Sequence, residues 1–226
     1  MKICTVYLCL GIALTLVMSS NLSAQSAKNA LTTAPNVLVN TTTGQDWTTI
    51  LNTMLHTSQQ KDLVMGVSLE TGLFTRTLVK SRGGNQDTSY AEANVQVRVL
   101  VDAGTANERM AEPGIVTFDK RYQELMVKLG GILTCTDNNG DGIIQYNECV
   151  LTDEEIQLIL DTLAAHAFNF ALDDLGSGTH TVSVQVRVTT DTGAQAGSSS
   201  ATGMVGKGSL VVEEVRLVKG SDITIN

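Results

Sequence analysis

The most chemically distinctive stretch of the sequence is CTDNNGDGIIQYNEC, which runs from Cys135 to Cys149. Acidic and amide side chains alternate in it around Gly142, and a cysteine closes each end. Counted from the first aspartate, positions 1, 3, 5, 9 and 12 all carry side-chain oxygens: Asp137, Asn139, Asp141, Gln145 and Glu148. Ca²⁺ prefers roughly six to eight oxygen ligands at about 2.3–2.6 Å, and alternate side chains of a tight loop converge on one point. The spacing therefore predicts a calcium site.

In this register, residues 137–148 resemble the calcium-binding loop of the EF-hand family. The resemblance implies that Gly142 makes the sharp turn and that the backbone carbonyl of Ile143 is a ligand. It also implies that Gln145 binds directly or through a water, and that Glu148 returns with two carboxylate oxygens. Oxygen ligands without a nearby histidine argue against transition metals. Mg²⁺ is a competitor, and a polar surface turn without metal is the alternative interpretation.

The sequence around the loop departs from the EF-hand pattern. Gly130 and Gly131 interrupt the helix that should enter the loop, and no second loop of this kind occurs in the chain. A calcium sensor needs paired helices that open a groove, so we expect calcium to stabilise the fold, with Ile144 anchoring the loop on the hydrophobic core. At ten to a hundred times a Kd of about 10⁻⁴–10⁻³ M, calcium would add about 1.4–2.7 kcal/mol to the free energy of unfolding.

The first 24 residues have the features of a secretory signal peptide. Lys2 supplies the positive charge, residues 3–18 form an apolar run, and Ala24 is a small residue suited to cleavage. The run is shorter than the roughly 20 residues that span a bilayer, although an uncleaved membrane anchor is the alternative. We predict a secreted or extracytoplasmic protein, periplasmic or extracellular, with no membrane span once the signal is cleaved.

Signal cleavage decides which cysteines remain. Cys4 and Cys9 leave with the signal, so the mature chain holds only Cys135 and Cys149, in a compartment where disulfides persist. We predict that these two form a disulfide, and two free or intermolecular thiols are the alternative. Closing a loop of about 15 residues contributes about 3 kcal/mol in the chain-entropy model.

The composition indicates a folded protein with an aliphatic core. The chain has 226 residues, of which 42% are hydrophobic, 17% charged and only 4% aromatic. Its net charge is −8, and removal of Lys2 makes it −9 because no other charged residue lies in the signal. An acidic chain without a basic patch repels nucleic acid and anionic membrane surfaces.

Period-two patterns predict β-strands along most of the mature chain. The clearest is ANVQVRVLVD, in which Val95, Val97 and Val99 point one way while polar side chains point the other. The pentapeptide VQVRV recurs at residues 184–188. A duplicated domain is one interpretation, but the flanking residues differ, so two half-buried antiparallel strands with the same pattern are favoured.

Two stretches have helical spacing instead. Residues 46–60 place apolar side chains at helical intervals. Residues 152–165 begin with Thr152 as a helix cap and Glu155 three residues later, the pattern of a capping box. Their apolar residues would form one stripe of a helix: Ile156, Ile159, Leu160 and Leu163.

Three other stretches bear on the layout of the chain. Residues 114–129 fit a helix or a strand, with glycine pairs favouring a bounded strand. Thr71-Gly72 predicts a turn. The segment 192–208, rich in glycine, serine and alanine, predicts a loop between strands and a candidate binding edge.

Together these patterns predict a mainly β fold, an antiparallel β-sandwich of immunoglobulin-like or jelly-roll-like type, with one or two short helices and an inserted EF-hand-like calcium loop. Three regions are expected: a signal peptide (1–24), a flexible leader (25–34) and one sandwich domain (35–226). The sandwich domain carries the calcium loop and a helix as an insertion at 135–164. The strand-rich part resembles secreted β-sandwich modules without matching a specific family.

These features indicate a secreted calcium-binding protein with a structural, adhesive or ligand-binding role toward an extracellular protein or carbohydrate. No catalytic motif such as G-x-S-x-G, a P-loop or H-E-x-x-H occurs in the sequence. The alternative is a secreted hydrolase, acting for instance on polysaccharide, that uses calcium structurally.

Overall fold

The protein is built almost entirely of antiparallel β-sheet. The computed structural model describes residues 29–34 and 46–217, so the expected signal peptide lies outside the described residues. Within them the only helical element is one short 3-10 turn, and no helix there is long and apolar enough to cross a membrane. The elements, in chain order, are β1 (Asn29–Ala34), β2 (Thr48–Thr57), β3 (Lys61–Ser81), β4 (Gln86–Val101), β5 (Arg109–Met110), β6 (Val116–Lys128), β7 (Ile132–Cys135), η1 (Tyr146–Glu148), β8 (Cys149–Thr152), β9 (Glu154–Leu175), β10 (Gly178–Ala194) and β11 (Gly197–Val215).

The strands form two large sheets and one small ribbon. Sheet A has the order β1-β11-β3-β9, and sheet B has the order β2-β10-β4-β5, with β6 also paired to β4. β7 and β8 pair only with each other in the described residues. The mainly β, antiparallel fold that the sequence predicts is confirmed, while its immunoglobulin-like or jelly-roll-like type stays a prediction.

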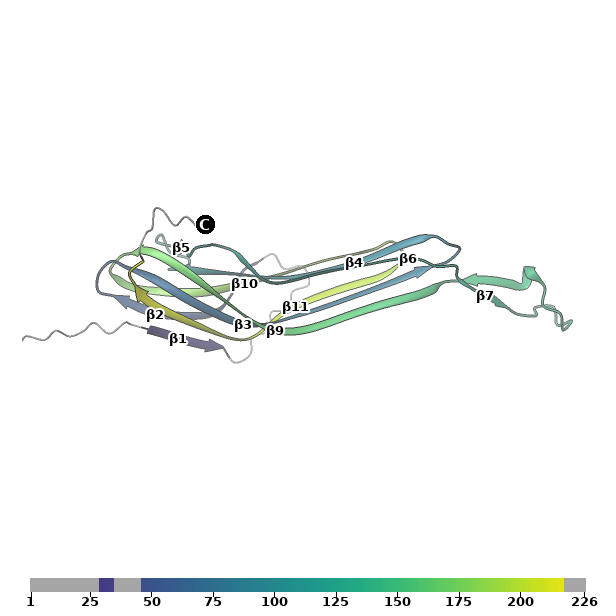
Figure 1. Ribbon diagram of the computed structural model, residues 1–226, viewed down its shortest axis with the longest axis horizontal. Helices are drawn as coiled ribbons and strands as arrows, with labels where there is room; N and C mark the ends of the chain where they lie inside the picture. Colours follow the sequence, from purple (N-terminus) through teal and green to yellow (C-terminus); the bar gives the residue numbers. More distant parts are fainter. Residues whose placement is uncertain (1–28, 35–45, 218–226) are drawn as a thin grey trace, which may run out of the picture.

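The molecule is elongated, because β3, β4, β9, β10 and β11 run through most of its length (Figure 1). We call the end that contains β1, β2 and β5 the head. We call the other end, where each sheet keeps three strands, the arm; it comprises residues 71–81, 86–95, 119–128, 154–164, 188–194 and 197–205. The ribbon, residues 131–152, projects beyond the arm.

Aliphatic side chains from both sheets fill the core of the head. Val95, Val97 and Val99 of β4 are fully buried, as their alternation predicts. On β3 the alternating Met65, Val67 and Leu69 are buried as well. Toward the arm the buried face of β3 changes to threonine at positions 71, 75 and 77, and Gln123 of β6 hydrogen-bonds two of these hydroxyls. The core of the arm is therefore partly polar and hydrogen-bonded.

The two VQVRV pentapeptides are neighbours in sheet B, which confirms that both are half-buried antiparallel strands. Residues 184–188 of β10 pair with residues 95–99 of β4, so valine faces valine and glutamine faces arginine. The outer face carries Arg98–Gln185 and Arg187–Gln96 hydrogen bonds. Trp47 lies against both guanidinium groups, with ring-centroid distances of 4.4 and 4.8 Å. When two copies of this pentapeptide pair antiparallel, each valine is opposite a valine and each glutamine is opposite an arginine.

Both predicted helices are wrong. Residues 154–165 belong to β9, which pairs along its length with β3, and residues 48–57 form β2. Glu155 does not serve a capping box but forms an ion pair with Lys80 across the β3–β9 ladder. A ladder to a 21-residue neighbour strand supplies more hydrogen bonds than one isolated helix could, so pairing overrides the local spacing.

Two predicted interruptions of the sheet are also wrong. Thr71-Gly72 is not a turn, because β3 continues through it and pairs on both sides. The segment 192–208 is the end of β10 and the first half of β11, joined by a tight turn at residues 195–196. Small residues suit β11 because Gly203 and Gly208 lie close to core side chains.

Two further segments are strands. Residues 114–129 hold strand β6, and residues 29–34, at the end of the expected leader, pair with β11 as β1.

Candidate metal centre

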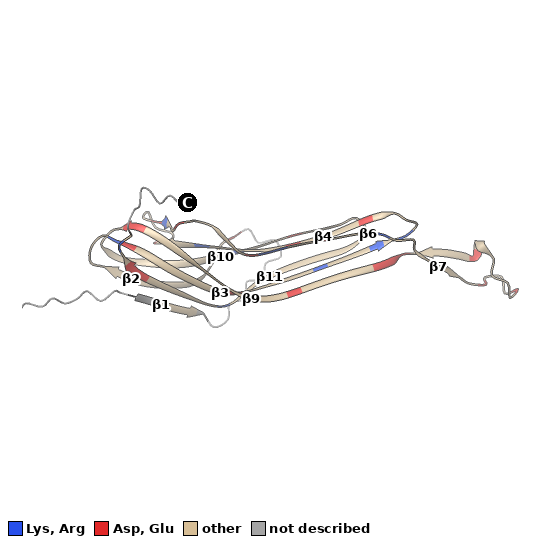
Figure 2. Ribbon diagram, viewed as in Figure 1, with Lys and Arg blue, Asp and Glu red and all other residues tan. Residues whose placement is uncertain are grey.

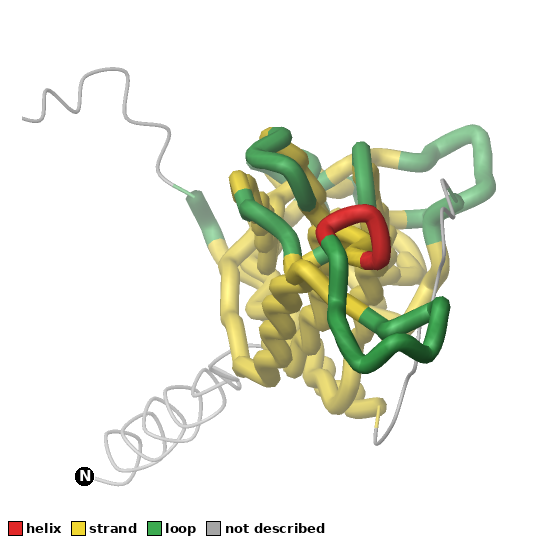
Figure 3. Tube along the Cα trace, turned by 90° about the vertical axis from the view of Figure 1, so that its right-hand side faces the viewer, coloured by secondary structure: helices red, strands yellow, loops and turns green. Residues whose placement is uncertain are grey.

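The loop that the sequence singles out forms the tip of the ribbon, at the end of the molecule opposite the head. Figure 3 looks onto this end and shows η1 and the loop in front of the sandwich strands. Every residue from Asn138 to Asn147 is exposed. The loop extends away from the sandwich, and its nature as an inserted calcium loop stays a prediction.

The base of the ribbon is held against the β3–β4 turn. Gly131 has a φ of +86°, and a Cβ added there would lie 2.8 Å from the carbonyl oxygen of Thr152, so glycine is required on both counts. The N–H of Gly131 donates to Glu154, and Arg82 pairs with Asp153. Thr152, expected as a helix cap, instead donates its hydroxyl to the carbonyl of Ile132 across the ribbon.

The disulfide Cys135–Cys149 is present, as the sequence predicts. Cys135 is the last residue of β7 and Cys149 is the first residue of β8, and their Cα atoms are 4.0 Å apart. The bond therefore ties the two ends of the loop where the strand ladder stops. The loop is closed at its neck by a covalent bond and at its base by hydrogen bonds.

The first half of the loop turns around the carboxylate of Asp137. Its Oδ1 accepts the N–H of Gly140 at 2.6 Å, and its Oδ2 accepts the N–H of Gly142 at 2.8 Å. Asn139 Oδ1 accepts the N–H of Asp141, and Asp141 Oδ1 accepts the N–H of Ile143 at 2.8 Å. Gly140 and Gly142 both have positive φ. The side chains at positions 1, 3 and 5 thus point into the turn that they stabilise.

Glu148 closes the loop. It is the one buried residue of the loop, and its Oε1 accepts the N–H of Asn138 at 3.2 Å while its Oε2 accepts the N–H of Gln145 at 2.9 Å. The carboxylate at position 12 is thereby brought back beside position 2. Gln145 in turn starts η1 with a reciprocal capping box to Glu148.

The electrostatics of the ribbon are uniformly acidic. Residues 131–152 contain three carboxylates, Asp137, Asp141 and Glu148, and no lysine or arginine, and Figure 2 shows red but no blue along the ribbon. The N–H of Gly142 holds the pKa of Asp137 below its ordinary value, helped by the N–H of Gly140 and opposed by desolvation. The carboxylate of Asp137 therefore stays ionised to a lower pH than an ordinary aspartate does.

The donor set suits a hard cation in kind, although the carboxylates are not gathered at one point. Among the described residues, no group of three or more His, Cys, Asp or Glu side chains comes together to hold a metal ion. The carboxylates of Asp137 and Glu148 each bind two backbone N–H groups, which leaves further lone pairs on every oxygen. The expected ligands of Ca²⁺ stay a prediction: the side chains of Asp137, Asn139, Asp141, Gln145 and Glu148 and the backbone carbonyl of Ile143.

The expected anchoring of the loop on the core is wrong. Ile144 is 57% exposed, Ile143 66% and Tyr146 86%. The ribbon carries the loop beyond the reach of the sandwich core, so position 8 has no apolar surface of its own chain to cover. Instead, three large apolar side chains surround an acidic, disulfide-closed tip.

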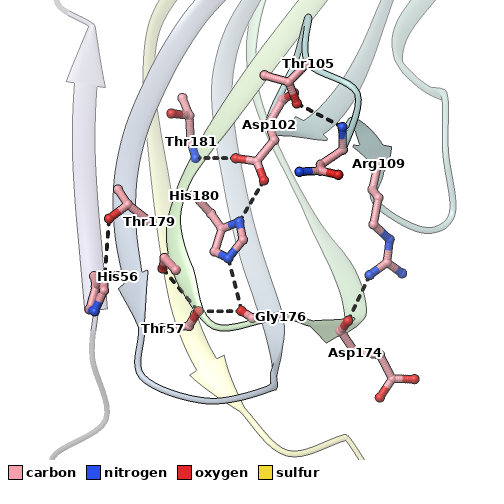
Figure 4. A network of polar contacts seen from close by, with 12 residues as sticks. His56, Thr57, Asp102, Thr105, Arg109, Asp174, Gly176, Thr179, His180 and Thr181 are labelled. Atoms are coloured by element: carbon pink, nitrogen blue, oxygen red, sulfur yellow. Dashed lines mark hydrogen bonds and ion pairs between the residues drawn. The ribbon is translucent and has the colours of Figure 1, made fainter.

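The head holds a second polar cluster, which the sequence did not reveal (Figure 4). Asp102, in the left-handed region at φ 56°, accepts the N–H of Thr181 and lies 2.7 Å from His180 Nδ1. His180 Nε2 lies 3.1 Å from the carbonyl oxygen of Gly176, which also accepts the hydroxyl of Thr57. These contacts join the β4–β5 loop to the β9–β10 turn, beside a hollow of about 420 Å³. The partners are 78 residues apart, so no local pattern could indicate them.

Comparison with known proteins adds no family. No protein-family model matches the chain, and no significant match occurs among curated proteins. Two solved structures of infectious bursal disease virus, of the Gx and Gt strains, align with 84% of this chain at 10% and 11% identity. The chain spans 40% and 42% of the lengths of those chains, and the TM-scores are 0.20 and 0.22. Similarities this low carry no argument about fold or function.

Proposed function

We propose that this is a secreted calcium-binding protein whose calcium loop, residues 137–148, forms an adhesive or ligand-binding tip. The observation that carries the proposal is the hydrogen bonding of Glu148, which brings position 12 back to position 2 across the loop. Oxygen ligands at every position that calcium requires are in register, and the disulfide holds the two ends of the loop together. Secretion is supported by the signal-like N-terminus and by the disulfide.

The location of the loop supports a contact role at the tip. Ile143, Ile144 and Tyr146 are exposed at the far end of a long molecule, next to the calcium ligands. A bound Ca²⁺ would neutralise part of the acidic charge around them and hold their backbone in one conformation. An extracellular protein or a carbohydrate is the expected partner, since tyrosine provides a flat amphipathic contact for either. Calcium is then expected to order the tip more than the sandwich.

The test is calcium titration by isothermal calorimetry on the mature, oxidised protein. We expect one site with a Kd of about 10⁻⁴–10⁻³ M, as in other extracellular calcium modules. Asp137→Asn removes one carboxylate from the loop and is expected to weaken binding at least tenfold. Asp161→Asn removes one carboxylate from the exposed strand β9 and serves as the charge-matched control, so it should bind calcium as the unaltered protein does.

Hydrogen exchange separates a local from a global effect. With calcium, amides of residues 136–149 should gain protection while those of β4 and β10 keep theirs, because the loop touches only the ribbon. Equal calcium binding by Asp137→Asn and Asp161→Asn would refute the assignment of the loop. Protection spread evenly over the core strands would refute the restriction of calcium to the tip.

A further inference from the structure

β9 is an edge strand over its whole length in the arm. It is the last strand of sheet A, and among the described residues its part in the arm, residues 154–164, pairs only with β3; in the head, Ala171 also bridges to Glu112. In Figure 1 it forms the lower rim of the arm, from the boundary with the head to the base of the ribbon. A row of backbone N–H and C=O groups on the side away from β3 is therefore open to pairing.

This edge is apolar and exposed. Between residues 154 and 164, five large aliphatic side chains are 39% to 68% exposed: Ile156, Leu158, Ile159, Leu160 and Leu163. Leu160, Leu158 and Ile156 are opposite the buried Thr75, Thr77 and Val79 of β3, so they point toward the inner face of the sheet, yet they stay partly exposed. Ile159 and Leu163 point outward. Both faces of the strand thus show apolar surface at the same place.

The usual devices that block an edge strand are missing here. Residues 154–164 contain no lysine and no proline, and the register with β3 has no bulge between residues 63 and 81. Two of the three acidic side chains are engaged within the chain: Glu154 accepts the N–H of Gly131, and Glu155 pairs with Lys80. Only Asp161 stands as a charge near the middle of the edge.

The direction of the free backbone groups follows from the neighbouring ladder. The N–H of Lys80 donates to the carbonyl of Ala196, so even-numbered residues of this part of β3 face β11 and odd-numbered ones face β9. Thr77, an odd-numbered residue of β3, is opposite Leu158. The even-numbered residues of β9 in this part therefore use their backbone N–H and C=O groups for hydrogen bonds to β3. The free N–H and C=O groups then belong to the odd-numbered residues 155, 157, 159, 161 and 163. The carbonyl of Leu158 additionally accepts Gln123, which leaves those groups untouched.

We propose that β9 pairs with β9 of a second copy of this chain, antiparallel, about a two-fold axis at Ile159. An antiparallel pair of identical strands is self-complementary, so one edge supplies both partners and the contact closes at two copies. The two sheets A become one continuous sheet. The heads of the two copies then point to opposite ends of the pair.

Charge and side-chain matching select this register and this partner. With the axis at Ile159, Leu158 faces Leu160 of the second copy, and Asp161 faces Gln157. With the axis at Leu158, Glu155 would face Asp161, and like charges directly opposite are unfavourable. Around the axis the copy of the same edge therefore offers Leu160 to Leu158 and Ile159 to Ile159, and nowhere along residues 154–164 do two carboxylates face each other. An unrelated acidic strand would not offer this match, because its carboxylates would face Asp161 or Glu155.

Sedimentation velocity of the mature, oxidised protein across a wide range of concentrations tests the association. We expect a dimer that dissociates on dilution. Ile159→Lys places a charge at the axis, and it should yield a monomer. Ile115→Lys alters an isoleucine with the same exposed fraction, 47% for both, immediately before β6, and it should remain a dimer. Near-ultraviolet circular dichroism of Ile159→Lys checks that the monomer is folded.

Cysteine cross-linking tests the register. Opposite residues of a hydrogen-bonded pair have Cα atoms about 5.5 Å apart, within the reach of a disulfide. Ile159→Cys should therefore link to itself under mild oxidation. Gln157→Cys lies about 14 Å from its own copy in this register and should not.

A monomer at every concentration, or an Ile159→Lys variant that still dimerises, would overturn the proposal. If Ile159→Lys is monomeric but also unfolded, Ile159→Cys decides, because cross-linking needs the folded edges to meet. A dimer in which Leu160→Cys links and Ile159→Cys does not would overturn the two-fold axis at Ile159. Neither result bears on calcium, so failure here leaves the tip assignment standing.

Discussion

At the scale of single residues, backbone N–H groups are the hydrogen-bond partners of two carboxylates in the loop. Asp137 accepts N–H groups from Gly140 and Gly142, and Glu148 accepts them from Asn138 and Gln145. For Asp137 these hydrogen bonds favour the ionised carboxylate and hold its pKa below the ordinary value. No basic residue of the ribbon contributes to this, because residues 131–152 contain no lysine or arginine.

The lowered pKa of Asp137 predicts how the loop responds to acid. A group whose pKa is lower in the ordered loop than in a disordered chain stabilises the ordered loop above the ordinary value, about 3.9. That contribution is lost as the pH falls through the lowered pKa. A carboxyl carbon NMR titration should give Asp137 a midpoint below 3.9, and the same residue in a peptide of residues 135–149 with both cysteines reduced should give the ordinary value. Equal midpoints in protein and peptide would contradict this.

The Asp102 carboxylate predicts a local weakness in the head. Asp102→Ala removes acceptors for Thr181 and His180 and places alanine at a positive φ, so we expect a loss of about 2–3 kcal/mol in the free energy of unfolding. Asp102→Asn tolerates that φ and keeps one acceptor, and it should lose about half as much. Denaturant melts measure both. Identical losses would mean that backbone conformation and the carboxylate contribute nothing separable.

At the scale of elements, the ribbon and β9 show opposite relations between local sequence and structure. In the ribbon, turn chemistry, glycines and the disulfide act within about 20 residues, so the local pattern decides the outcome. In β9, residues 154–165 have helical spacing, yet pairing with β3 makes them a strand. Local preference decides where the neighbours are close in sequence and yields where a long partner strand is present.

The disulfide leads to a prediction about calcium affinity, because it restricts the conformations of the loop without calcium. A Cys135→Ser, Cys149→Ser double variant removes the bond at the neck of the loop, where the β7–β8 ladder ends. We expect calcium affinity to fall about tenfold, because the free loop then loses more conformational entropy on binding. Calorimetry measures it, with reduced and oxidised unaltered protein as the matched pair. Unchanged affinity would show that the hydrogen bonds of Glu148 alone close the loop.

At the scale of the whole molecule, stability and the candidate function lie at different ends. The aliphatic core is concentrated in the head, the arm has a partly polar core, and the ribbon packs on neither sheet (Figure 1). A contact made at the tip is thereby carried well away from the head. The price of this shape is a long, exposed edge at β9.

Removal of the ribbon tests that separation. Replacing residues 132–151 with an Asn-Gly turn should leave the thermal midpoint within a few degrees of the unaltered protein, because the ribbon buries little of the sandwich. Met65→Ala, at a fully buried site in the head, should instead cost about 2–5 kcal/mol. Calorimetric melts compare the two. A large drop on removal of the ribbon would mean that the ribbon folds as part of the sandwich.

Part of the fold was accessible from the sequence through alternation. Val95, Val97 and Val99 are buried as their period-two pattern indicates, and the pairing of Cys135 with Cys149 followed from the count of mature cysteines. The helix predicted at 152–165 and the loop at 192–208 were wrong for one reason. Both rest on local preference, while the strands there are held by partners more than 70 residues away.

By itself, the sequence determined which side chains stand together: oxygen-bearing side chains at the spacing of an EF-hand loop, two cysteines that bracket them, and valine alternation that requires sheets. These features are written in neighbouring residues, whose spacing is read directly. Only the tertiary structure decided where that chemistry lies. The path of the long strands placed the loop at a tip rather than on the core, joined Asp102 to His180, and left β9 as an open edge. Such relations depend on pairing between distant segments, which no short stretch of sequence contains.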